Sequence, residues 1–227
     1  MVKFVSKESK KSKESKKSKE SKKSKESKKS KESNNDDLFA EVQNVVASVD
    51  LRCKIKLERA ASRLPGDVQV SYIPEQFPGV VVKIKKPKVS ILVFSSGKLV
   101  VTGAKSVEMI EEAVEVISEL LRQAGHNVKH EATITVQNIV ASGTLGKRIN
   151  LELAALLLEH SMYEPEQFPG LIYRMQEPKV VLLLFQSGKL VCTGAKKEEY
   201  VYQSIHKIFG ILEEIDAFEA DSLQLPS

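Results

Sequence analysis

Tryptophan is absent from the 227 residues of this chain, and cysteine occurs only at Cys53 and Cys192. Neither cysteine has a His or a second Cys at metal-ligand spacing, so the sequence predicts neither a metal site nor a disulfide framework. Isolated cysteines of this kind usually serve as small core-filling residues in proteins of a reducing compartment.

Long apolar runs are absent as well. No segment approaches the roughly 18 consecutive apolar residues that a membrane span needs. The N-terminus carries Lys and Ser where a secretory signal would be apolar. We therefore expect an intracellular, cytoplasmic protein with no membrane partner.

Catalytic signatures are missing. None of the four His residues pairs with Cys, Ser or an acid at catalytic or metal-binding spacing; these are His126, His130, His160 and His206. The segment SGKLVVTGAKS contains Gly and Lys but not the G-x-x-x-x-G-K-[ST] pattern of a phosphate-binding loop, and is more typical of a hairpin strand that leads into a helix. The sequence thus argues against an enzyme and predicts no catalytic residue, metal ion or cofactor.

The net charge of +5 conceals a division of the chain. Residues 1–35 hold 14 of the 35 basic residues and 5 of the 30 acidic ones, so the remainder has 21 basic and 25 acidic side chains and a net charge of −4. The hexad SKESKK repeats through the first segment without the apolar residues that offset chain entropy, which predicts a disordered tail over 1–35. Such a tail is either expendable or a loose tether for phosphates that strengthens non-specific DNA binding.

After Asp36 the sequence consists of two similar repeats. Residues 42–51 return as 136–145 with seven of ten positions identical, and residues 72–105 return as 163–196 with 21 of 34 identical. A unit of about ninety residues is too long for a solenoid repeat and indicates a domain-sized duplication with an internal two-fold axis. We expect repeats over 36–127 and 128–216, followed by a short C-terminal tail over 217–227.

Each repeat has the pattern of five strands and two helices. Pro-Gly and Ser-Gly turn signals separate short apolar runs, so the strands should pair antiparallel. In the first repeat the strands are expected near 39–48, 68–72, 79–85, 89–95 and 98–103, and the helices near 56–64 and 106–123. The fold class is α+β, with a ten-stranded antiparallel sheet and four helices on one of its faces.

The strands are apolar on both faces, although two helices cover only one face of five strands. VSILVF at 89–94 lacks the alternation of a strand with one wet face, and VVLLLF repeats the anomaly in the second unit. An open apolar face of this size usually marks a binding surface. A second copy, a membrane or ligand, or a nucleic acid would each bury it.

The composition of the open face favours the minor groove of DNA. Valine, leucine and phenylalanine are expected there beside Asn and Thr, with Lys at the border, which suits A·T pairs because the amino group of guanine would collide with tight apolar packing. Phe77 and Phe94 stand seventeen residues apart, and Phe168 and Phe185 repeat that spacing. Apolar wedges placed in this way unstack base steps and kink the duplex.

The segments VQNIVAS, YEPEQFPGLIYRM, EPKVVLLLF and SGKLVCTGAK resemble the TATA-binding protein family over residues 38–215. That family is itself a standard example of minor-groove wedging. The resemblance implies a curved saddle with the helices on its convex face and Phe77, Phe94, Phe168 and Phe185 as the intercalating residues. It implies base contacts by Asn44, Asn138, Thr102, Thr193, Val46, Val140, Val100, Val191, Leu92 and Leu183. It implies phosphate contacts by Lys83, Arg174, Ser96, Ser187, Lys98, Lys189, Lys105 and Lys196.

The two halves are nearly identical in sequence, and in this respect the chain resembles archaeal members of the family. By resemblance, the protein is a general initiation factor that binds a TATA box, bends it, and assembles with a transcription factor B protein and, indirectly, RNA polymerase. A saddle this symmetric should bind a near-palindromic box in either orientation with similar energy, so direction should come from a partner on one half. The resemblance assigns that contact to Glu164, Glu166 and Gln167. The first repeat has Ile73 at the position of Glu164.

Two other interpretations of the open face remain. RNA-binding sheets also display aromatic rings, although they stack bases at the middle of the sheet, whereas these rings are expected at turns and strand ends. A self-associating module is the other alternative, and the protein free of DNA is a candidate homodimer through its apolar face.

Overall fold

A computed structural model describes residues 38–129 and 131–219. The predicted N-terminal tail lies outside the described residues. So does the predicted C-terminal tail, apart from its first three residues.

The first repeat contains the expected five strands and two helices. Its elements are β1 (Phe39–Asp50), α1 (Leu57–Arg63), β2 (Gln69–Ser71), β3 (Gly79–Lys85), β4 (Lys88–Phe94), β5 (Lys98–Ala104) and α2 (Val107–Gln123). β1 continues two residues beyond the predicted end because Val49 and Asp50 still pair with strands on both sides.

The second repeat follows the same order. Its elements are β6 (Thr133–Thr144), α3 (Leu151–Leu157), β7 (Ser161–Met162), β8 (Leu171–Met175), β9 (Val180–Leu184), β10 (Lys189–Ala195) and α4 (Glu198–Glu214). β7 has only two residues, in the region where the second repeat is three residues shorter than the first.

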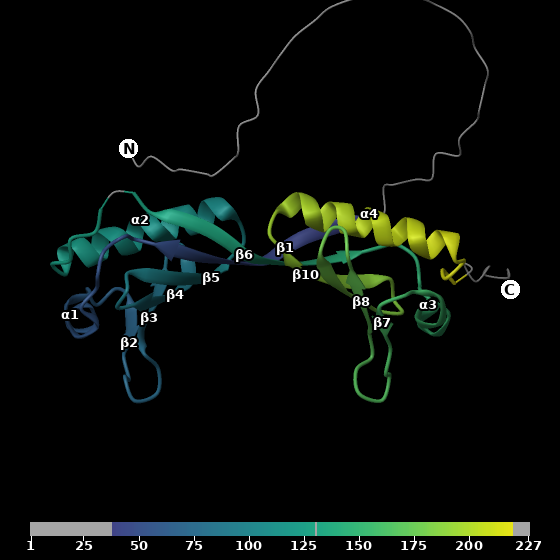
Figure 1. The fold of residues 1–227 in the computed structure, drawn as a ribbon, viewed down its shortest axis with the longest axis horizontal. Coiled ribbons are helices and arrows are strands. Elements are labelled where there is room, and N and C mark those ends of the chain that lie inside the picture. Colours follow the sequence, from purple (N-terminus) through teal and green to yellow (C-terminus); the bar gives the residue numbers. More distant parts are fainter. Residues whose placement is uncertain (1–37, 130, 220–227) are drawn as a thin grey trace, which may run out of the picture.

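All ten strands form one antiparallel sheet with the order β2-β3-β4-β5-β1-β6-β10-β9-β8-β7. β1 and β6 pair at its centre from Phe39 opposite Thr144 to Asp50 opposite Thr133, so the internal two-fold axis lies between them. The sheet arches into a saddle whose two sides end in long loops (Figure 1). The predicted α+β fold with a curved ten-stranded sheet is confirmed.

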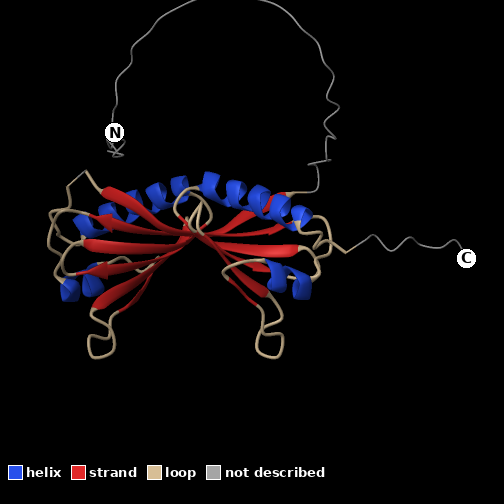
Figure 2. Cartoon of the chain, turned by 45° about the vertical axis from the view of Figure 1, so that its right-hand side comes forward, coloured by secondary structure: helices blue, strands red, loops and turns tan. Residues whose placement is uncertain are grey.

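The helices cover the convex face and leave the concave face open (Figure 2). Strand side chains alternate between the two faces: Val89, Ile91 and Val93 of β4 are buried on the helix side, whereas Leu92 and Phe94 are half-buried on the concave side. The apolar character of both strand faces therefore has two causes: one face builds the core and the other forms the open surface.

The ends of α2 follow from local sequence. Ser106 is the N-cap, and its hydroxyl accepts a hydrogen bond from the Met109 N–H. Gly125 has φ +87°, and the N–H groups of Gly125 and His126 donate to the carbonyls of Arg122 and Leu121. This is the Schellman motif that a glycine after the last turn favours, and it agrees with the stop expected at Gly125.

Cys192 is buried in the hydrophobic core. Cys53 is partly buried and packs against the edge of that core. Burial raises the pKa of both thiols, so both stay protonated at neutral pH. In the described part of the chain, no three or more His, Cys, Asp or Glu side chains are grouped to hold a metal ion. No helix within 38–129 and 131–219 is long and apolar enough to cross a membrane.

Candidate nucleic-acid interface

The floor of the concave face is a continuous set of half-buried apolar side chains. In each repeat, a leucine of one strand stands directly across from a valine of the next: Leu92 opposite Val100, and Leu183 opposite Val191. At the centre, Val46 stands opposite Asn138, and Val140 opposite Asn44. The structure therefore brings the predicted apolar and amide groups of both repeats onto one surface.

Asn44 and Asn138 have their side-chain amides fixed in one orientation. The Oδ1 atom of Asn44 accepts the Gly103 N–H at 2.8 Å, and that of Asn138 accepts the Gly194 N–H at 2.6 Å. Because a backbone N–H only donates, each side-chain carbonyl must face it. The amide NH₂ groups are then left for Thr102 at 3.5 Å and Thr193 at 3.2 Å, and for a ligand.

Two irregular strand ends create this arrangement. Gly103 and Gly194 have φ values of +90° and +93°, a conformation that glycine adopts without the steric cost of a side chain. The pairing register shifts beside each of them, between Val45 and Ala47 in β1 and between Cys192 and Ala195 in β10. The bulged backbone thus turns its N–H toward the asparagine, and the repeated TGAK segment encodes the turn.

The four predicted intercalating phenylalanines form two pairs at the edges of the concave face. The ring centroids of Phe77 and Phe94 are 5.7 Å apart with planes at 62°, and those of Phe168 and Phe185 are 5.8 Å apart at 64°. Both pairs have the edge-to-face geometry that aromatic rings prefer. All four rings are half-buried, so each pair holds its shape while one side stays open.

A glycine under each ring pair makes this packing possible. A Cβ on Gly79 would lie 2.8 Å from Cε1 of Phe77, and a Cβ on Gly170 would lie 2.7 Å from Cε1 of Phe168 and 3.1 Å from Cε1 of Phe185. Real Cβ atoms essentially never lie within 3.0 Å of another atom, so the glycine of each FPG sequence leaves the space that the Phe77 and Phe168 rings occupy.

We expect Gly170→Ala to weaken binding to A·T-rich duplex DNA by roughly tenfold, about 1.4 kcal/mol. The added methyl group pushes the Phe168 and Phe185 rings out of their paired position, and overpacking of this kind typically costs about 1–3 kcal/mol. Titration of labelled duplex measures the affinity. Gly66→Ala is the matched control, since nothing lies within 4 Å of its Cβ. Equal affinities of the two variants would show that the glycine does not position the rings.

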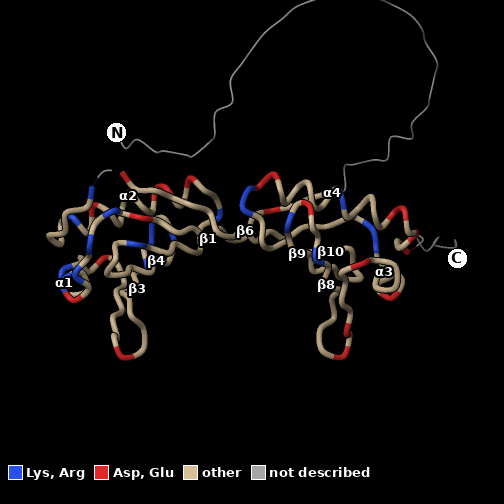
Figure 3. The backbone as a smooth tube through the Cα atoms, in the orientation of Figure 1, with Lys and Arg blue, Asp and Glu red and all other residues tan. Residues whose placement is uncertain are grey.

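Basic and hydroxyl side chains border the apolar floor. All eight of the predicted phosphate contacts are exposed: Lys83, Ser96, Lys98, Lys105, Arg174, Ser187, Lys189 and Lys196. Figure 3 shows basic positions along the strands and acidic positions at the tips of both loops below the saddle. The loop of the first repeat, residues 72–78, carries Glu75, whereas that of the second, residues 163–169, carries Glu164 and Glu166. We call these loops the first and second stirrup.

Sequence reasoning missed a polar network on the concave face beside the two-fold axis. The Gln43 amide donates to the Ser142 hydroxyl at 2.8 Å, and the Gln137 amide donates to the Ser48 hydroxyl at 2.7 Å. Gln and Ser stand in both copies of the repeated VQNxVAS segment, so the duplication itself was the available signal. The exposed side chain of Phe39 at the start of β1 was missed too, because it lies outside the repeated segments.

The fold and this surface define a class: a saddle-shaped binding protein built from two repeats, with covered convex and open concave faces. A family model described as "Transcription factor TFIID (or TATA-binding protein, TBP)" matches residues 40–124 and 133–215. The chain belongs to the TATA-binding protein family. This family consists of binding proteins, which confirms the expectation that the chain is not an enzyme.

Similar proteins come from archaea. The chain is 48% identical over 174 residues to a TATA-box-binding protein of Pyrobaculum islandicum, covering 77% of this chain and 86% of that protein. It is 48% identical to the one of Pyrococcus furiosus, covering 76% and 92% of the two chains. The solved structure of Methanococcus jannaschii TBP superposes with a TM-score of 0.72 at 45% identity, covering 77% of this chain and 98% of that one.

Proposed function

We propose that this protein is a transcription initiation factor that binds A·T-rich TATA-box DNA through the minor groove. The observation that carries the proposal is the pair of asparagine amides, in each of which the carbonyl is held by a glycine N–H at 2.8 or 2.6 Å and the NH₂ group is left as a donor. The floor of the minor groove at A·T pairs offers only the acceptors adenine N3 and thymine O2, which match these donors.

The same floor discriminates against G·C pairs. The guanine amino group projects into the minor groove, where it would meet an amide donor or the methyl groups of Val46 and Val140. Valine offers no acceptor for that amino group, so its water shell would be lost without replacement. A·T and T·A present the same acceptors, so the floor distinguishes composition more than order.

The paired rings are proposed to bend the DNA. Phe77 with Phe94 and Phe168 with Phe185 lie at the two edges of the concave face, the positions from which apolar side chains enter base steps. The folded part is net acidic, so recognition depends on apolar fit and on the lysines of the rim rather than on total charge.

A gel-shift comparison tests the proposal. We expect a TATA duplex to bind at least about a hundredfold more tightly than a G·C duplex of equal length, because each mismatched pair typically costs about 1–3 kcal/mol. Single-stranded RNA is the third arm, since it would bind best if the rings stacked bases as an RNA-binding sheet does. A preference for RNA, or equal affinity for both duplexes, would refute the assignment.

The second repeat is proposed to dock a transcription factor B family protein, through which RNA polymerase joins the promoter. Support comes from exposed groups that the first repeat lacks. Glu164 stands where the first stirrup has Ile73. On α3, Leu156 and Leu157 are 80% and 50% exposed, at the positions of Ser62 and Arg63 on α1. Exposed acidic and apolar groups in the second repeat suit a protein partner, and the carboxylate repels DNA phosphates.

Self-association of the DNA-free protein through the concave face remains a second candidate, because an open apolar face favours burial by another copy. In the proposed role, the protein works beside the chromosome in the cytoplasm of an archaeal cell. DNA would then compete with any dimer for the same surface.

A further inference from the structure

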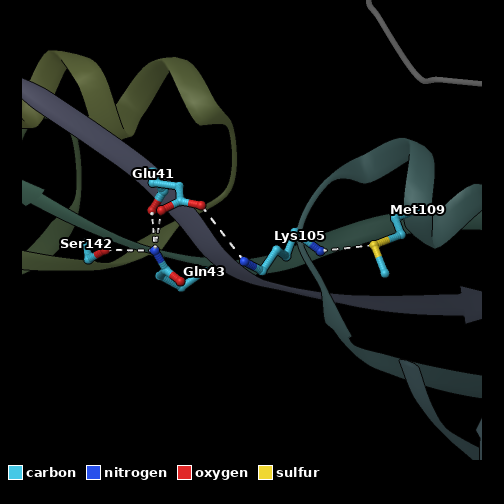
Figure 4. Close-up of polar contacts among 5 residues, drawn as sticks. All are labelled: Glu41, Gln43, Lys105, Met109 and Ser142. Atoms are coloured by element: carbon cyan, nitrogen blue, oxygen red, sulfur yellow. Dashed lines mark hydrogen bonds and ion pairs between the residues drawn. The ribbon is translucent and has the colours of Figure 1, made fainter. Parts of the chain in front are cut away.

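The two halves of the concave face differ in charge close to the two-fold axis. The Glu41 carboxylate lies 3.9 Å from Nζ of Lys105 and accepts a hydrogen bond from the Gln43 amide at 3.2 Å (Figure 4). Glu41 pairs directly with Ser142, and side chains opposite each other in an antiparallel pair share a face. The carboxylate therefore stands on the DNA-facing side, next to a lysine proposed to contact phosphate.

A second carboxylate repeats the pattern at the other end of β1. Asp50 stands directly across from Lys98, which is also proposed to contact phosphate. In the second repeat the matching positions hold neutral residues: Thr135 corresponds to Glu41 and lies in the same repeat as Lys196, and Thr144 stands across from Lys189. Two basic residues of the first repeat thus have an acidic neighbour that their counterparts lack.

We propose that Glu41 and Asp50 weaken the binding of phosphates by the first repeat relative to the second. The saddle then has an orientation preference on DNA whose two halves differ in backbone charge. The inference rests on the proposed DNA-binding function. It goes beyond that function because it assigns an effect on orientation to two residues that are not among the proposed DNA contacts. A carboxylate near the backbone repels phosphate and competes for the lysine. DNA whose two halves differ in backbone charge is then bound in one orientation preferentially.

The size of the preference follows from the exposure of the groups. Lys105 and Glu41 have side-chain exposures of 62% and 57%, so solvent screens their interaction. Exposed pairs contribute little individually, and two of them correspond to a preference of about two- to tenfold between orientations. Such a bias leaves the saddle nearly symmetric, and on a duplex with the same backbone charge in both halves direction still has to come from a partner.

The duplication itself supplies matched substitutions. Oδ1 of Asp50 accepts the Arg52 N–H at 2.8 Å, and the Thr144 hydroxyl accepts the Gly146 N–H at the matching place at 3.1 Å. Asp50→Thr therefore retains this turn. Glu41→Thr installs the residue that the second repeat already carries. The converse substitutions Thr135→Glu and Thr144→Asp place both carboxylates in the second repeat.

The test uses a self-complementary A·T box in which uncharged methylphosphonates replace the phosphates of one half. The full-length protein carries a donor dye on Glu75→Cys in the first stirrup, with Cys53→Ser to prevent labelling elsewhere, and the acceptor dye is at either end of the duplex. Energy transfer then reports which repeat lies over the neutral half. We expect the first repeat to occupy it in about two- to tenfold excess.

The excess should disappear in the Glu41→Thr/Asp50→Thr variant and reverse in the variant with all four substitutions. The unmodified box is the internal control, because its symmetry allows no preference. On that box, Glu41→Thr/Asp50→Thr should also steepen the dependence of log K on log salt by up to about two, as lysines are released to phosphates. An excess that survives Glu41→Thr/Asp50→Thr overturns this inference and leaves the proposed function intact. Failure to bind the unmodified box overturns the proposed function itself.

Discussion

Replacement of Phe168 and Phe185 by alanine is expected to weaken binding to a TATA duplex about a hundredfold and to leave the DNA much less bent. Burial of one phenylalanine side chain contributes about 1.5–3 kcal/mol, and insertion of the ring is what holds the step open. Part of the loss is offset because the duplex no longer has to be unstacked. Energy transfer between dyes at the two ends of the duplex measures the bend, and titration measures the affinity.

The fold should survive this change, because both rings are only half-buried and pack against each other at the edge of the concave face. Thermal unfolding followed by circular dichroism checks this point. Tyr202→Ala is the matched control, since this aromatic side chain is 48% exposed on α4, on the convex side. A double variant with an unchanged bend would show that the rings pack against the groove without entering a base step.

The duplication made most of the fold predictable. Repeated segments indicated the number of strands and the two-fold relation. The excess of apolar residues in β3, β4 and β5, together with only two helices for five strands, indicated an open face. Periodicity identifies faces because side chains alternate along a strand. It also placed the phenylalanines at strand ends and turns, where the structure has them in pairs.

The orientation of the asparagine amides was not predictable in the same way. It depends on bulges that turn the Gly103 and Gly194 N–H groups toward Oδ1 atoms 59 and 56 positions away in the chain. A bulge breaks the alternation on which sequence interpretation depends. The Glu41–Lys105 pair was not predictable either, because both residues lie outside the β1–β5 pairing, which begins at Val45 opposite Ala104. Repeats thus reveal what the halves share, whereas contacts beside a shifted register become visible only in the structure.

Charge reversal in the second stirrup, Glu164→Lys with Glu166→Lys, is expected to abolish ternary assembly with a transcription factor B protein, a loss of at least about a hundredfold. Like charges brought together at an interface cost several kcal/mol. Binding to DNA alone should stay unchanged or tighten slightly, because both side chains are exposed on the stirrup, away from the apolar floor. Gel shifts with and without the partner separate the two complexes.

The first stirrup offers a matched control for this prediction. Ile73→Lys with Glu75→Lys places two lysines at the corresponding positions of the other repeat. If the second stirrup carries the partner, this control forms the ternary complex normally. Ternary assembly that survives reversal at Glu164 and Glu166 would refute the assignment, and equal loss in both variants would show that the partner senses total charge. Loss in the second stirrup alone would mean that the partner binds one half of the saddle, so that the partner supplies the direction that a nearly symmetric box does not.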